Sequence, residues 1–263
     1  MFAEQPHRYA RQSSRQPAFT LIEVLVSITI VLILAVLTFW GTKHLSESAK
    51  TARCLGNLRQ IGTAVLGYAG DHGGALPFLV SGDADKPSSH NSIWQQDLDS
   101  YLPYPKVNPT GGGRPLAGSP FFCPSADPNK SWLGTEPDYA AVGRYSANEG
   151  ASGVFSQNAW GTFVPALKLV NIRNPERCLM VADACTRHSV LDGSWSMGLN
   201  ADNLTVSAGV PASGLAPRHG HNGRDSRSGR VNMLFCDTHV EAFSFADPRL
   251  KDRAFVQSLL VPY

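Results

Sequence analysis

The chain has 263 residues, a length that suits one large or two small domains with a substantial hydrophobic core. Apolar residues form 43% of the composition and charged residues 17%, which excludes collagen, coiled-coil and polar low-complexity classes. The formal net charge of +2 argues against a dedicated nucleic-acid-binding protein, because such proteins carry a strong basic excess.

The first feature along the chain is a continuous apolar segment from Phe19 to Trp40, in which Glu23 is the only charged residue. A helix of this length measures about 33 Å, close to a bilayer core of about 30 Å. Basic residues flank the segment on both sides, so their count does not decide its orientation. The segment is therefore long enough to span a membrane.

Three interpretations of this segment compete: a secretory signal peptide, a plain membrane anchor and a processed pilin-type N-terminus. A signal peptide is disfavoured, because its apolar region usually has about 7–15 residues and ends in a small-residue cleavage site. A plain anchor accounts for the hydrophobicity, but an acid in a transmembrane helix calls for a partner. The alternative for Glu23 is a place at headgroup level, where its carboxylate stays hydrated.

Residues 15–26, RQPAFTLIEVLV, resemble the cleavage and methylation signal of type IV prepilins and type II secretion pseudopilins. The resemblance implies that a prepilin peptidase cuts between Ala18 and Phe19, that Phe19 is then N-methylated, and that Glu23 is the glutamate required for assembly. Ala18 stands where the family usually has Gly, so slower processing is expected. The new amine of Phe19 would lie four residues from Glu23, and the two groups can pair on one helix face or between adjacent subunits.

Beyond Gly41, apolar and small residues recur at three- and four-residue steps as far as Ala69, which predicts an amphipathic helix that ends at residues 71–74. These residues are Leu45, Ala49, Ala52, Leu55, Leu58, Ile61, Val65 and Ala69. One helix of about 50 residues, apolar all round in its first half and one-sided in its second, resembles the spine of a pilin. The predicted domains are a cytoplasmic leader (1–18), a transmembrane and assembly segment (19–41), an amphipathic continuation of the helix (42–70) and a globular head (71–263).

Short strand-like runs separated by turn residues follow in the head. The candidates are Leu76–Val80, Gly143–Ser146, Cys178–Ala182 and Val231–Asp237. The predicted fold class is α+β and pilin-like, with a long N-terminal helix packed on a head that contains an antiparallel sheet.

Several strings in the head resemble the large pseudopilin-like proteins of Planctomycetes and Verrucomicrobia, among them RCLGNLRQIG at 53–62 and FCPS at 122–125. The stretch from His219 to Asp237 resembles their H-X9-DG segment, with a longer spacing between the two residues. Thr238 stands in place of the usual Gly, and Thr takes positive φ poorly, so a different local turn is expected.

All five cysteines follow the apolar segment, and disulfides are expected if the head lies outside the cytoplasm. Sequence alone leaves the pairing open, and five buried reduced thiols are the alternative. The resemblance implies the pair Cys54 and Cys123, because the two strings that contain them occur together in that family. Cys178 and Cys185 lie seven residues apart, and on one extended strand their separation of about 23 Å would prevent a bond.

A metal or enzymatic site is the sharpest alternative to a structural role. His219, His221, Asp237 and His239 offer ligands for a transition ion if they converge in space. The chain lacks the zincin, P-loop, dinucleotide-binding and nucleophile-elbow motifs. We therefore expect no enzymatic activity, no catalytic residue, no transition metal and no cofactor.

A structural Ca²⁺ is the one ion that the resemblance leaves open, because some secretion pseudopilins hold it in a carboxylate-lined loop. The acidic residues of such a loop would be Asp83 with Asp85, or Asp225. The basic stretch 218–230 contains four arginines and suits contact with an anionic ligand or a partner subunit, or else a solvated insertion.

The resemblance implies a pseudopilin-like structural subunit of a type II secretion-type pseudopilus. A type IV pilus subunit is one alternative, and a membrane-tethered binding protein that recognises glycan, DNA or a secreted substrate is another. The implied partners are prepilin peptidase, other pilin or pseudopilin subunits, the inner-membrane assembly platform and the lipid bilayer; nucleic acid is not expected. The implied location is the bacterial inner membrane, crossed once, with the leader in the cytoplasm and the head in the periplasm.

Overall fold

The architecture comes from a computed structural model of the chain. The structure describes residues 20–82, 92–103, 119–126, 138–144, 153–159, 162–185, 196–197, 214–220 and 229–262. The chain divides into two compact units, Met1–Leu45 and Ser46–Tyr263. Helix α1 (Leu21–Asp71) contributes residues to both units.

In the first unit, the structure describes one helical segment, which begins at Leu21 after the non-helical residue Thr20. The stretch Leu21–Thr38 has a mean hydropathy of 2.8, and none of its side chains is buried within the protein. By length and composition it is a candidate membrane span.

In the second unit, one face of α1 enters the core of the head. Cys54, Leu58, Ile61 and Val65 are buried at the three- and four-residue spacing expected of an amphipathic helix. The predicted stripe also included Ala49 and Ala52, but both are exposed. That part of the prediction is wrong because, among the helix residues whose side chains the structure describes, burial begins at Cys54.

In the part of the head that the structure describes, there are ten strands in one sheet, two short helices besides α1, and three 3₁₀ turns. The strands are β1 (Val80–Ser81), β2 (Ser92–Ile93), β3 (Tyr139–Arg144), β4 (Phe155–Ala159), β5 (Thr162–Phe163), β6 (Leu179–Cys185), β7 (Ser196–Met197), β8 (Gly214–Leu215), β9 (Arg230–Phe235) and β10 (Val240–Ser244). The helices are α2 (Trp94–Asp97) and α3 (Arg253–Leu260), and the 3₁₀ turns are Asp99–Tyr101, Leu169–Asn171 and Pro248–Lys251.

The main path of the sheet runs β10-β9-β6-β3-β4-β1-β2, and β5, β7 and β8 pair with β4, β3 and β6. The α+β class is confirmed, but the sheet is mixed rather than wholly antiparallel. β4 runs parallel to both β3 and β1, and β7 runs parallel to β3. Strand direction depends on long-range pairing, which local propensity does not report.

The predicted strands match the structure best near the C-terminus. Val231–Asp237 corresponds to β9, which ends two residues earlier because a turn begins at Cys236, and Cys178–Ala182 corresponds to β6. Of the predicted strand Gly143–Ser146, Gly143 and Arg144 form the end of β3, and the last two residues lie outside the described residues. Leu76–Val80 is mostly irregular, because the backbone N–H of Leu76 donates to Leu167 in a loop instead of to a neighbouring strand.

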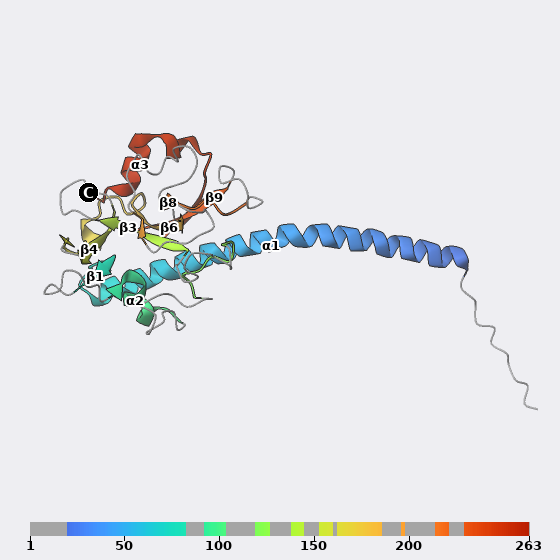
Figure 1. The fold of residues 1–263 in the computed structure, drawn as a ribbon, viewed down its shortest axis with the longest axis horizontal. Coiled ribbons are helices and arrows are strands. Elements are labelled where there is room, and N and C mark those ends of the chain that lie inside the picture. Colours follow the sequence, from blue (N-terminus) through green and yellow to red (C-terminus); the bar gives the residue numbers. More distant parts are fainter. Residues whose placement is uncertain are drawn as a thin grey trace, which may run out of the picture. The chain divides into compact units, whose positions relative to one another are not determined.

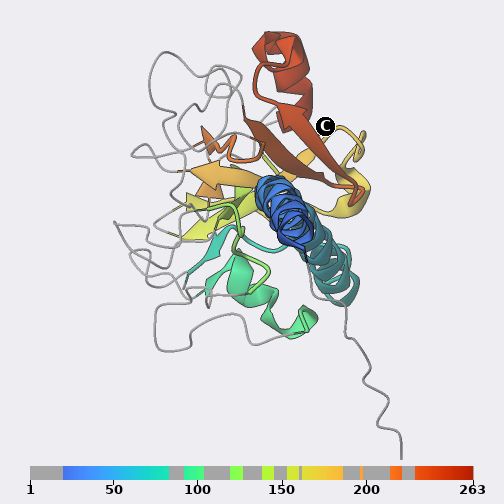
Figure 2. The same cartoon turned by 90° about the vertical axis from the view of Figure 1, so that its right-hand side faces the viewer.

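The sheet carries α1 on one face and α3 on the other. Tyr139 and Ala141 of β3 belong to the apolar cluster that includes α1, whereas Ala140 and Val142 belong to the cluster that includes α3. This alternation is the period of two expected of a strand covered on both faces. Figure 1 shows β3 and β6 between the two helices, and Figure 2 shows β9, β10 and α3 together at one side of the head.

Gly153, just before β4, is the residue whose identity the backbone restricts most. Its φ is +86°, and a Cβ there would lie 2.3 Å from the carbonyl oxygen of Gly143. The N–H of Gly153 donates to the carbonyl of Leu260 at the end of α3. A side chain at this position would therefore strain the junction of β3, β4 and α3.

Candidate functional site

The described part of the chain begins at Thr20, inside the predicted processing segment. Ala18 and Phe19, the predicted scissile pair, lie outside the described residues. Thr20 precedes the helix, and its backbone N–H and hydroxyl each donate to Glu23 Oε2 at 2.8 Å. The N–H of Glu23 donates back to the Thr20 hydroxyl at 3.4 Å, which completes a capping box at the start of α1.

Polar side chains farther along this segment are satisfied within the helix. The hydroxyls of Ser27, Thr29 and Thr38 donate to the carbonyls four residues earlier, at 2.7–2.8 Å. Such bonds remove the need for water around these groups in a lipid environment. Glu23 is then the one charged side chain of the apolar run.

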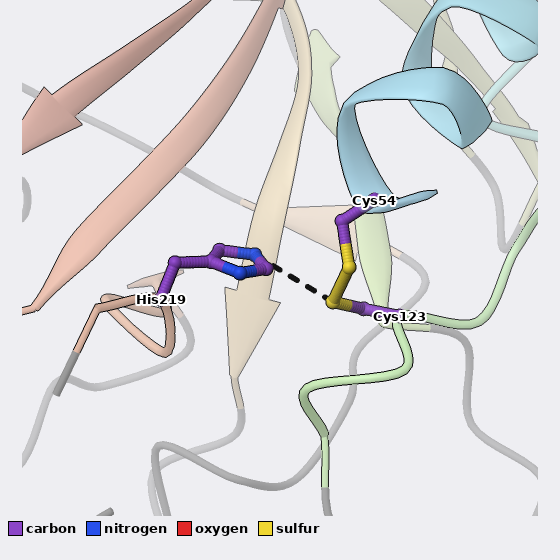
Figure 3. A group of neighbouring side chains, drawn as sticks. All are labelled: Cys54, Cys123 and His219. Atoms are coloured by element: carbon purple, nitrogen blue, oxygen red, sulfur yellow. Dashed lines mark hydrogen bonds between the residues drawn. A yellow bond between two sulfur atoms is a disulfide. The ribbon is translucent and has the colours of Figure 1, made fainter. Parts of the chain in front are cut away.

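A disulfide joins α1 to the head, between Cys54 and Cys123 (Figure 3). This is the pair that the family resemblance implies. The bond links residues 69 apart in sequence, with a Cα–Cα distance of 5.2 Å. One turn along the helix, Asn57 Nδ2 donates to the carbonyl of Phe122 at 2.8 Å, so the segment around Cys123 is held at two successive points.

His219 faces this disulfide from the loop before β9 (Figure 3). Its Nε2 atom lies 3.5 Å from the sulfur of Cys123 and 3.1 Å from Oδ2 of Asp183, and its Nδ1 atom lies 3.4 Å from the hydroxyl of Thr51. The imidazole is buried, and Asp183 also receives the backbone N–H of Asn232 at 2.7 Å. His219 therefore connects α1, β6 and the disulfide.

Next to His219, Arg218 forms a buried ion pair. Its Nη1 atom donates to Asp138 Oδ1 at 2.9 Å, and its Nη2 atom donates to the carbonyl of Ala184. The other oxygen of Asp138 accepts the N–H of Cys123 at 2.7 Å. Two buried carboxylates thus hold the consecutive side chains of residues 218 and 219.

Tyr139 completes this polar cluster under α1. Burial raises the pKa of its phenol well above the usual value, and the carboxylates of Asp183 and Asp138 raise it further. The neutral hydroxyl donates to the backbone carbonyl of Cys54 at 3.3 Å. We define the buried cluster as Cys54, Cys123, Asp138, Tyr139, Asp183, Arg218 and His219.

The buried cluster supports a structural role better than metal binding. Cys54, Cys123 and His219 each offer a ligand atom, all within 4.8 Å of one another. Soft metals bind thiolates, however, and these two sulfurs are bonded to each other, so neither of them is a thiolate.

The turn between β9 and β10 holds the other residue of the H-X9-DG-like stretch. Asp237 Oδ1 accepts from both Nδ1 and the backbone N–H of His239, at 2.6 and 3.1 Å. The N–H of Thr238 donates to the carbonyl of Phe235 at 2.9 Å, and Thr238 has a φ of +73°. Thr238 therefore adopts the positive φ whose cost for Thr was the reason to expect a different local turn.

In this conformation, Thr238 packs against α1. A Cβ built on Gly62 would lie 3.4 Å from both Cβ and Cγ2 of Thr238. The threonine side chain thus covers the surface of α1 at Gly62, which has no side chain of its own.

Among the described residues, the alternative set of ligands around His219 and Asp237 does not assemble. His219 pairs with Arg230 at the start of β9, whereas Asp237 lies beyond its end. The strand between them is about 17 Å long. His221 lies outside the described residues, as do Asp83, Asp85 and Asp225, the acids that a calcium loop would use.

Sequence reasoning missed Asp138 and Tyr139, and it assigned no role to Asp183. The available signal was an acidic residue inside or beside a run of apolar residues, as at Asp183 in LMVADAC. Acids are almost never fully buried unless paired, so such a position predicts a buried partner without naming it.

Comparison with known proteins bears on the processing segment only. No curated protein matches the chain, and no solved structure does. The H-X9-DG resemblance of the head therefore stays a prediction. Residues 13–39 match the prokaryotic N-terminal methylation motif, which confirms that the chain carries a prepilin-type signal.

Proposed function

We propose that the protein is a pseudopilin-like structural subunit that is cut before Phe19, N-methylated and assembled into a type II secretion-type pseudopilus. One observation carries the proposal: the methylation motif at 13–39 coincides with an apolar helix whose first turn contains Glu23. Signal peptides and plain anchors need the apolar run, but neither needs an acid at this position.

Glu23 supplies the physical reason for assembly. Within one chain, its Oε2 atom accepts only neutral donors, the N–H and hydroxyl of Thr20, among the described residues. An ionised carboxylate that enters lipid is favoured by a cationic partner. The amine released at Phe19 of a neighbouring subunit is such a cation, so pairing favours association and sets the axial register of the helices.

The head suits a structural part better than a catalyst. Its buried cluster places the Arg218–Asp138 ion pair and the contact of His219 with Asp183 in the interior, where they bind the loop at 218–219 to the sheet. Removal of the leader also takes away three arginines and one glutamate, which leaves the mature chain with equal numbers of basic and acidic residues. A chain without net charge suits lateral packing rather than capture of a polyanion.

The test replaces Glu23 by Ala and by Gln in the full-length protein, expressed with a prepilin peptidase and an assembly system. Processing should persist in both variants, while recovery in the sheared filament fraction should fall at least tenfold. Thr29→Ala, which removes a polar group of the same helix and keeps Glu23, is the matched control and should assemble normally.

Assembly of both Glu23 variants at the wild-type level would overturn the proposed assembly role and favour a tethered binding protein. Long wild-type filaments at the cell surface, with no effect on protein secretion, would favour a type IV pilus subunit over a pseudopilin.

A further inference from the structure

Two more cysteines are buried in the head, at neighbouring ends of β6 and β9. Cys178 directly precedes β6, and Cys236 directly follows β9. The antiparallel register pairs Leu179 with Phe235, so one further step places Cys178 opposite Cys236. The N–H of Cys236 donates to the carbonyl of Cys178 at 3.0 Å, which shows that the pairing extends to these two residues.

This arrangement matches what a disulfide requires. Opposed residues of an antiparallel pair point to the same face, with Cα atoms about 4.5–5.5 Å apart, and disulfides span Cα distances of about 4.4–6.8 Å. The two side chains touch, since a hydrogen bond with the thiol of Cys178, together with burial, raises the pKa of the Cys236 thiol well above its usual value. Both residues belong to the apolar cluster that includes α1.

No other described sulfur competes for either residue. Cys54 and Cys123 are bonded to each other. Cys185 ends β6, and seven strand residues place it about 23 Å from Cys178, beyond the reach of a disulfide.

We propose that Cys178 and Cys236 form a second disulfide, which joins β6 to β9 in the exported head. The inference rests on the proposed function, because disulfides persist in an oxidising compartment. The S–S bond forms as each thiol loses its hydrogen, and the two electrons and two protons pass to the disulfide of a dithiol oxidase, which becomes two thiols. Because both sulfurs are buried in the folded head, oxidation takes place before this part of the core closes.

The test uses full-length protein purified in detergent from membranes of a bacterial host. The protein is unfolded without reductant in an alkylating reagent, digested and mapped by mass spectrometry. The expected result is two linked peptide pairs, Cys54 with Cys123 and Cys178 with Cys236. One cysteine of the five, Cys185, is then alkylated.

The other outcomes separate this inference from the proposed function. Alkylated Cys178 and Cys236 beside a linked Cys54–Cys123 pair would overturn the second disulfide and leave the exported location intact. Alkylation of all five cysteines would overturn both, and a bond from Cys185 to either residue would overturn the pairing. As matched controls, Cys185→Ser should retain both linked pairs, and Cys178→Ala should leave Cys236 alkylated.

Discussion

The disulfide between α1 and the head offers the most quantitative test of the fold. Replacing Cys54 and Cys123 by Ala removes a crosslink between residues 69 apart in sequence. The loop-closure entropy that this crosslink removes from the unfolded chain corresponds to about 4 kcal/mol. A domain has roughly 5–15 kcal/mol of stability, so the loss is a large share of the total.

The measurement is urea unfolding of the full chain in one detergent, followed by tryptophan fluorescence. Trp94 is a suitable reporter, because it is fully buried and packs edge-on against Phe121, two residues from Cys123. The midpoint should fall in the double variant, and the slope should not decrease, because an unfolded chain without the crosslink exposes more surface.

The pattern among the single variants decides whether the two sulfurs are bonded. Cys54→Ala and Cys123→Ala should each destabilise the head by nearly as much as the double variant, since either substitution breaks the same bond. Additive effects of the single variants, or a loss below about 1 kcal/mol in the double variant, would show that the two sulfurs form no stabilising crosslink.

Three further substitutions test the packing of the head by the same unfolding assay. Gly153→Ala should cost more than about 3 kcal/mol, because its Cβ would overlap the carbonyl of Gly143; a normal midpoint would contradict the positive φ. Thr238→Gly should stabilise the head by about 1 kcal/mol through relief of its positive φ, and a lower midpoint would contradict this expectation. Arg218→Met should cost about 3–5 kcal/mol, since it leaves the carboxylate of Asp138 buried without its cation, and Asp138→Asn in the same chain should recover part of the loss. If the second substitution instead adds its own full cost, the ion pair is not the source of the effect.

The parts of the fold that follow local rules were predictable from sequence. Hydropathy and the spacing of apolar residues predicted one helix of about 50 residues, and α1 spans 51. The clearest strands, β6 and β9, were found because both are apolar and bounded by turn residues. The parallel pairing of β4 was not predictable, because it depends on residues far apart in sequence.

The candidate site, too, has a part that was predictable from sequence and a part that was not. The processing motif is contiguous, so resemblance alone identified it at residues 15–26, inside the matched range 13–39. The buried cluster unites residues from α1, β3, β6 and two loops, and no single stretch of sequence contains the pairing of His219 with Asp183. Thr238 shows that an intrinsic preference can also mislead, since it opposes positive φ, yet Thr238 adopts positive φ where it contacts Gly62.

The most direct test of the central claim is the mass of the N-terminal peptide of protein purified from membranes of a host that contains prepilin peptidase. We expect a chain that begins at N-methylated Phe19, and Ala18→Gly should increase the processed fraction. A chain that retains residues 1–18, or one that begins beyond Trp40, would contradict it.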